Sequence, residues 1–150
     1  MSNKIFKIII LVIAVAYFVY YALTLNSSSH FIDTVDLIFH EAGHTIFFFT
    51  GDFFRMLAGS AFQVFIPLFF SLYFYFSNQK FSGALCLLWV GQNLLNVSVY
   101  AGDAVNMSLD LLGGDSVIHD WNYLLVSLGL LNKTILVSKI IYYCGIAFGV

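Results

Sequence analysis

The stretch FHEAGHTIFF, residues 39–48, places two histidines and the only glutamate of the chain inside an apolar segment. Histidines four residues apart lie on one face of an α-helix, so His40 and His44 can offer ring nitrogens to a single metal ion. Glu41 follows the first histidine and can reach a water molecule on that metal. The spacing predicts a helix with a zinc site, in which Glu41 is the general base of a hydrolytic reaction.

The composition around this stretch is typical of a membrane protein. Of the 150 residues, 61% are hydrophobic and 9% are charged, with a mean hydropathy of +0.91. Soluble globular domains are far more polar. The net charge is −2 and the few basic residues are scattered, which gives no basis for a nucleic-acid partner. We therefore expect a multi-pass integral membrane protein whose surroundings are the lipid bilayer.

Five segments are apolar enough to be expected as membrane helices, because about 20 residues are needed to cross about 30 Å of hydrocarbon. They cover residues 4–25, 31–50, 53–76, 81–102 and 134–150. A shorter helix over residues 116–131 is expected to lie at the interface or to re-enter the membrane, because Lys133 would otherwise sit at mid-bilayer. The predicted fold is a single all-α domain, residues 1–150, that forms a polytopic membrane helix bundle.

The basic residues suggest the orientation of this bundle. With the N-terminus in the cytoplasm, Lys80 is the only basic residue on the outer side, in agreement with the positive-inside rule. The second predicted helix then runs inward, and His44 precedes its end by six residues. At a rise of 1.5 Å per residue, His44 lies roughly 9 Å from the cytoplasmic boundary.

Polar residues form a stripe along the helix that contains the two histidines. Asp33, Asp36, His40 and His44 follow helical spacing on an otherwise apolar helix. Ionisable groups at membrane depth must face protein or water. Asp36 lies one turn before His40 and could accept the second ring N–H of that histidine, which would fix its tautomer.

A catalytic zinc site needs a third protein ligand. The candidates are Asp103, Asp110, Asp115, His119 and Asp120. His119 belongs to the sequence HDW at the start of a predicted helix, where a three-histidine site with Asp120 behind it is chemically sound. A second polar stripe on the fourth predicted helix could face the histidines, and it comprises Gln92, Asn96, Tyr100 and Asp103, with Asn93 beside it.

These residues resemble the site-2 protease family of intramembrane zinc metalloproteases. Its members carry HExxH followed by a glycine, here Gly51, and a later Asn-Leu-Leu-Pro segment that ends in Asp-Gly. The stretch NLLNVSVYAGD, residues 93–103, is similar in its Asn-Leu-Leu, with Asn96 in place of the proline. The resemblance implies Asp103 as the third zinc ligand, and Asn93 as a residue that positions substrate or stabilises the oxyanion.

We therefore expect a zinc-dependent metalloendopeptidase that hydrolyses membrane-protein or peptide substrates near the cytoplasmic side, with Asp103 as third ligand and His119 as the alternative. Recognition of the substrate would come from helix packing, from a partner protein or from a second copy of the chain. The spacing of Gly145 and Gly149 is a weak indication of such a second copy. A non-catalytic zinc-binding protein with a structural, sensing or transport role stays open, as does a plain membrane scaffold. Glu41 distinguishes them, because neither alternative needs a base beside the first histidine.

Overall fold

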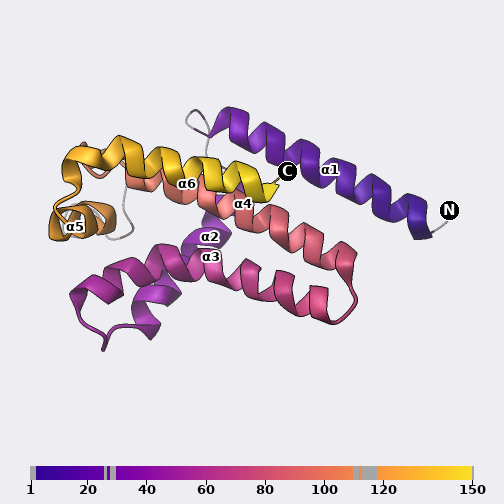
Figure 1. Cartoon of the computed structure of the whole chain (residues 1–150), viewed down its shortest axis with the longest axis horizontal. Coiled ribbons are helices and arrows are strands. Elements are labelled where there is room, and N and C mark those ends of the chain that lie inside the picture. The colour runs from indigo at the N-terminus through magenta and orange to yellow at the C-terminus, as the bar shows by residue number, and fades with distance from the viewer. Residues whose placement is uncertain (1–2, 26, 28–29, 110–111, 113–117, 150) are drawn as a thin grey trace.

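The computed structural model of this chain describes residues 3–25, 27, 30–109, 112 and 118–149 (Figure 1). The described residues form helices and contain no strand, so the predicted all-α class is confirmed. The elements are α1 (Asn3–Thr24), α2 (Phe31–Ile46), α3 (Asp52–Phe76), α4 (Lys80–Gly102), α5 (Asp120–Ser127), the short 3-10 helix η2 (Leu131–Lys133) and α6 (Thr134–Gly149).

Helix α4 is the centre of the bundle, because α6, α3 and α1 all pack against it. Helix α2 packs on α3, and α6 runs alongside α4 with α5 at its N-terminal end (Figure 1). The backbones of α4 and α6 touch at glycines, where a methyl group on Gly91 would lie 2.8 Å from the carbonyl oxygen of Gly145. The small-residue pair Gly145 and Gly149 therefore packs within the chain, against α4 and Phe18 of α1.

Three helices are long and apolar enough to cross a membrane, which is fewer than the five predicted. They are Lys4–Thr24, Asp52–Phe76 and Lys80–Gly102. Helices α5 and α6 meet at an angle of 115° and would count as a fourth, broken span. Helix α2 ends at Ile46 instead of Thr50, and its 16 residues rise only about 24 Å. It ends early because residues 47–50 form the reversal into α3, and Gly51 adopts a left-handed φ of 87°.

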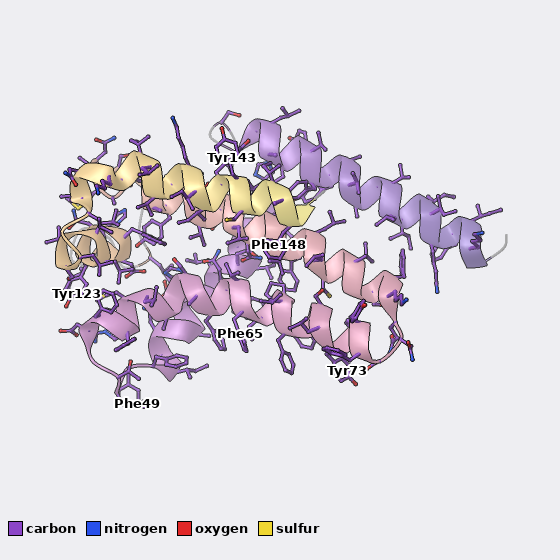
Figure 2. The ribbon with its side chains drawn as sticks, viewed as in Figure 1. Phe49, Phe65, Tyr73, Tyr123, Tyr143 and Phe148 are labelled. Carbon is purple, nitrogen blue, oxygen red and sulfur yellow. The ribbon has the colours of Figure 1, made fainter. Side chains whose placement is uncertain are left out.

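The exposed and buried surfaces are those expected of a protein surrounded by lipid. Large apolar side chains cover the outside, including Phe65 and Tyr73 on α3, which are 54% and 55% exposed (Figure 2). The interior is unusually polar, with Asp36, Gln63 and Gln92 all less than 5% exposed. Buried polar groups need hydrogen-bond partners, so the contacts between helices in this bundle are to a large extent polar ones.

Candidate metal centre

Helix α2 presents His40 and His44 one turn apart toward α3. The Nε2 atoms of the two rings lie 3.0 Å apart. His40 is buried and His44 is half-buried. The predicted convergence of the two histidines is therefore present, in the last turns of α2.

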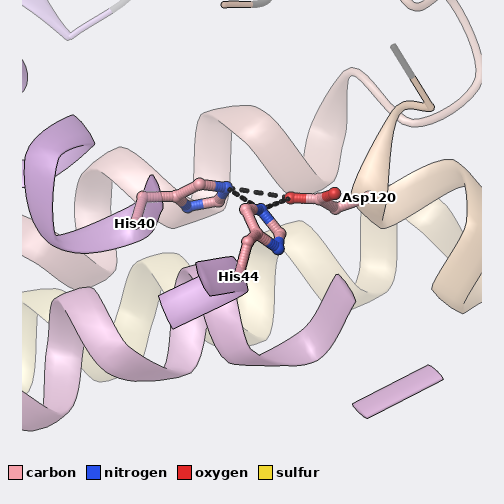
Figure 3. Close-up of side chains that lie close together, drawn as sticks. All are labelled: His40, His44 and Asp120. Atoms are coloured by element: carbon pink, nitrogen blue, oxygen red, sulfur yellow. Dashed lines mark hydrogen bonds and ion pairs between the residues drawn. The ribbon is translucent and has the colours of Figure 1, made fainter. Parts of the chain in front are cut away.

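Asp120, the first residue of α5, completes a group of three (Figure 3). Its Oδ2 atom lies 2.9 Å from Nε2 of His40 and 3.0 Å from Nε2 of His44. Helix α5 is held in place by the indole N–H of Trp121, which donates to Ser60 on α3 at 3.0 Å. Among the described residues, this is the one group of three whose histidine and carboxylate atoms converge in this way.

The Nδ1 atoms of His40 and His44, which point away from the group of three, each face a carbonyl oxygen. Nδ1 of His40 lies 3.1 Å from Oε1 of Gln63, and Nδ1 of His44 lies 2.8 Å from the backbone oxygen of Arg55. Because these oxygens only accept, each neutral ring carries its hydrogen on Nδ1 and has a lone pair on Nε2. Three acceptor atoms then face one another at 2.9–3.0 Å, an arrangement that a cation between them stabilises.

The donor set fits a zinc ion. Two imidazoles and a carboxylate are among the usual protein ligands of catalytic zinc, with bonds of about 2.0–2.2 Å. At those bond lengths, tetrahedral ligand atoms lie roughly 3.3 Å apart. The three atoms here need to separate by only a few tenths of an ångström. His40, His44 and Asp120 would hold the ion, and the outer contacts from Gln63 and Arg55 would keep both rings in the tautomer that binds metal.

Two glycines create the space for this group. A side chain on Gly43 of α2 would overlap the backbone carbonyl of Ala58, so the two helices meet with their backbones in contact. One residue along α3, a methyl group on Gly59 would lie 2.6 Å from Nε2 of both histidines. The histidine nitrogens therefore lie against bare backbone, at a point where any larger residue would occupy the candidate metal position.

The structure does not bring the predicted third ligands, Asp103 and His119, into this group. Oδ2 of Asp103 lies 3.4 Å from Nε2 of His119, and the carboxylate accepts hydrogen bonds from the backbone and hydroxyl of Ser108 and from the backbone of Leu109. Nδ1 of His119 accepts from the backbone N–H of Asn122 and so caps α5. As the N-cap, His119 holds the start of α5, where its neighbour Asp120 lies. The other two candidates, Asp110 and Asp115, lie outside the described residues.

Burial alone would raise the pKa of the Asp103 carboxyl, but the hydrogen bonds from Ser108 and Leu109, with a contribution from His119, lower that pKa below its ordinary value. The carboxylate is therefore held in its charged form. Its hydrogen bonds hold the backbone of Ser108 and Leu109, in the segment that follows α4.

None of the hydrogen bonds of Asp36, Asn93 and Asn96 goes directly to His40 or His44 among the described residues. Asp36 accepts hydrogen bonds from Trp89 at 3.0 Å and Gln92 at 2.8 Å, so it joins α2 to α4 and does not contact His40. Asn93 donates within α4 to the carbonyl of Trp89. Asn96 accepts from Gln63, which is the residue that contacts His40, and so lies one residue further from the group.

Glu41 lines a cleft that opens beside the three residues. The cleft has a volume of about 1110 Å³ and also borders His40, His44 and Asp120. No described residue forms a hydrogen bond or ion pair with the Glu41 carboxylate, whereas its backbone oxygen accepts from Thr45. The Glu41 side chain thus contributes to the wall of the cleft that borders the candidate metal position.

Sequence reasoning missed three contributors to the site. Gln63 is absent from the predicted ligands and supporting residues, and the backbone carbonyl of Arg55 and the space at Gly59 have no side chain that could indicate them. The shared face of Ser60 and Gln63 on α3 was the available signal, since both contact the site or its supporting helix.

Comparisons with known protein families, curated proteins and solved structures find no match for this chain.

Replacing Asp120 should remove metal binding, whereas the same change at Asp103 should not. We expect Asp120→Asn to lower zinc affinity by at least about 100-fold, because even outer partners of a zinc ligand contribute 10- to 100-fold. Asp103→Asn should keep zinc at one ion per chain. Zinc content after dialysis against a chelator measures both. Loss of zinc in Asp103→Asn alone would show that the ligand set differs from the group in the structure.

Gly59→Ala should prevent zinc binding in a protein that still folds. Its methyl group would lie 2.6 Å from both Nε2 atoms, well inside the usual carbon contact distance of about 3.5–4.0 Å. Gly102→Ala is the control, because the methyl group there meets only the side chain of Ser138, at 3.0 Å, which can rotate. Equal zinc titration curves for the two variants would contradict the proposed metal position.

Asp103→Asn should destabilise the metal-free protein by about 1–2 kcal/mol near neutral pH, because hydrogen bonds to a charged group are lost. A lowered folded-state pKa contributes stability above the ordinary value of 3.8 that disappears as the pH falls through the folded-state value. The difference in unfolding free energy between wild type and variant should therefore shrink below pH 3.8. Asp52→Asn, at an exposed ion pair, should show little difference at any pH.

Proposed function

We propose that this chain is an intramembrane zinc metalloprotease, which hydrolyses peptide bonds in membrane-embedded segments. The observation that carries the proposal is the convergence of His40, His44 and Asp120 in a cleft that the Glu41 side chain also lines, within a largely apolar helix bundle. Three protein ligands with room at the cleft side are typical of catalytic zinc sites, whereas structural zinc sites are usually closed by four.

Each residue of the site has a distinct part in this reaction. A zinc ion bound there supplies a Lewis acid that lowers the pKa of water toward about 7 and polarises the scissile carbonyl. The Glu41 carboxylate accepts a proton from the attacking water and passes it to the nitrogen of the leaving amine. His40, His44 and Asp120 keep their lone pairs directed at one point, supported by Gln63 and Arg55.

The cleft supports an extended peptide as substrate. It runs from the site along α2 and α4 to Tyr142 and Tyr143 of α6, and it combines carboxylates with apolar residues such as Leu37 and Val99. Its volume of about 1110 Å³ is slightly above the range of about 300–1,000 Å³ for sites that bind small molecules. A substrate helix would have to unwind before cleavage, because its carbonyl groups are otherwise engaged in intrahelical hydrogen bonds.

The site lies near one end of the membrane helices, between the last turns of α2, the end of α4 and the start of α5. The start of α1 lies beside the start of α4, where Lys7 lies over the ring of Phe81, so the site is at the end of α4 away from the N-terminus. With the N-terminus in the cytoplasm, cleavage would therefore occur near the outer surface and not near the cytoplasmic surface that the sequence predicts. Recognition of the substrate would then depend on the helices around the cleft, or on a partner protein or second copy that presents the segment.

Glu41→Gln tests the proposal. We expect the variant to bind zinc as wild type does and to lose hydrolysis by about 10²- to 10⁴-fold, because the base is removed while the ligands stay. The readouts are zinc content and cleavage of a fluorophore-quencher peptide built on an apolar membrane segment, both in detergent.

A zinc chelator is the control for metal dependence, and added zinc should restore cleavage in the wild type only. Stoichiometric zinc without cleavage of any segment would favour a non-catalytic zinc-binding role. A wild-type protein that folds but binds no zinc would contradict the proposal and would favour a role as a membrane scaffold.

A further inference from the structure

The two histidines differ in what fixes their tautomers. Nδ1 of His44 faces a backbone carbonyl, which cannot be exchanged for a donor. Nδ1 of His40 faces the side-chain amide of Gln63, whose oxygen and NH₂ group have nearly the same shape. If the amide were turned around, it would donate to Nδ1, and the hydrogen of a neutral His40 would move to Nε2. That nitrogen would then be unable to bind a metal.

The opposite end of the Gln63 amide is held by a residue of α4. Nε2 of Gln63 donates to Oδ1 of Asn96 at 3.1 Å, and Nδ2 of Asn96 donates in turn to Oδ1 of Asp33 at 3.2 Å. Gln63 is buried and Asn96 is half-buried. The three side chains come from α3, α4 and α2, so they connect the first turn of α2 to His40 by way of both neighbouring helices.

Asp33 gives this chain of hydrogen bonds its direction. A carboxylate only accepts, and Asp33 already accepts from the hydroxyl of Tyr21 at 2.7 Å and from the backbone N–H of His30 at 2.8 Å. Asn96 must therefore turn its NH₂ group toward Asp33 and its oxygen toward Gln63. Gln63 must then turn its NH₂ group toward Asn96 and its oxygen toward His40.

We propose that Asp33 and Asn96 are positioning residues which act through Gln63 to hold His40 in the tautomer with Nδ1 protonated and Nε2 free for metal. This deepens the proposed function and rests on its metal site. Neither residue touches the metal position, yet the loss of either should weaken metal binding, because the Gln63 amide is then free to turn.

The first test is the His40 tautomer in the metal-free full-length Asp120→Ala protein, in which the carboxylate that could hold a hydrogen on Nε2 is absent, measured by ¹⁵N nuclear magnetic resonance of labelled histidine in detergent. In this background, Nδ1 should be protonated and Nε2 bare. Asn96→Leu should give a mixture of both tautomers. Asn93→Leu, the same substitution on the same helix, should leave the tautomer unchanged. An unchanged tautomer in Asn96→Leu would overturn the proposal, and this test does not depend on whether zinc binds.

The second test is zinc affinity, determined by competition with a chelator. Asn96→Leu and Gln63→Leu should each lower it by about 10- to 100-fold, the usual range for outer partners of a ligand. In the Gln63→Leu background, Asn96→Leu should cause no further loss, because it acts only through Gln63. Equal losses in both backgrounds would show that Asn96 acts by packing and would contradict the proposal. No zinc in wild type would refute the proposed metal site.

A rescue variant covers the case in which leucine at this position disturbs folding. In Asn96→Asp combined with Asp33→Asn, the carboxylate moves to α4, where it can accept from Gln63 and from the new amide on α2. Gln63 then keeps its orientation, so the His40 tautomer and zinc affinity should stay close to those of wild type. A folded double variant with a mixed tautomer would contradict the directional argument.

Discussion

Helices α2 and α3 cross with their backbones in contact, and the candidate site depends on that crossing. Gly43 has no side chain to separate the helices, so the carbonyl of Ala58 lies directly against it. At this separation the histidines of α2 reach the bare backbone at Gly59, the carbonyl of Arg55 and the amide of Gln63. A wider crossing would remove all three contacts together. In HEAGH, the glycine therefore matters to the geometry as much as the residues that carry chemistry.

The bundle is held together largely by hydrogen bonds between helices. Lipid offers no hydrophobic gain when two apolar helices associate, so close packing and polar contacts have a greater share than in a soluble protein. Asp36 joins α2 to α4 through Trp89 and Gln92, and glycine contacts join α4 to α6. The same polar residues that mark this sequence as unusual for a membrane protein are thus those that assemble its helices.

The helical class and the histidine pair could be predicted because both follow from local periodicity. Apolar windows predict helices within a few residues, and the i, i+4 spacing places His40 and His44 on one face. The third member of the group, Asp120, depends on how α5 returns to α3, which local patterns do not encode. It stood among five candidates for the third ligand but was placed behind Asp103 and His119, because the capping of α5 by His119 and the contact of Trp121 with Ser60 are tertiary features.

Asp120 follows His40 in the chain by 80 residues and sits on a helix of only eight. During synthesis, the histidines and Glu41 are therefore made and inserted long before their carboxylate partner exists. The cap from His119 and the hydrogen bond from Trp121 to Ser60 place α5 at the position where the group is complete. If the chain is the protease proposed above, a nascent chain would be inert toward peptide bonds until α5 has folded back, and this delay would protect the surrounding membrane proteins, and the chain itself, from premature cleavage.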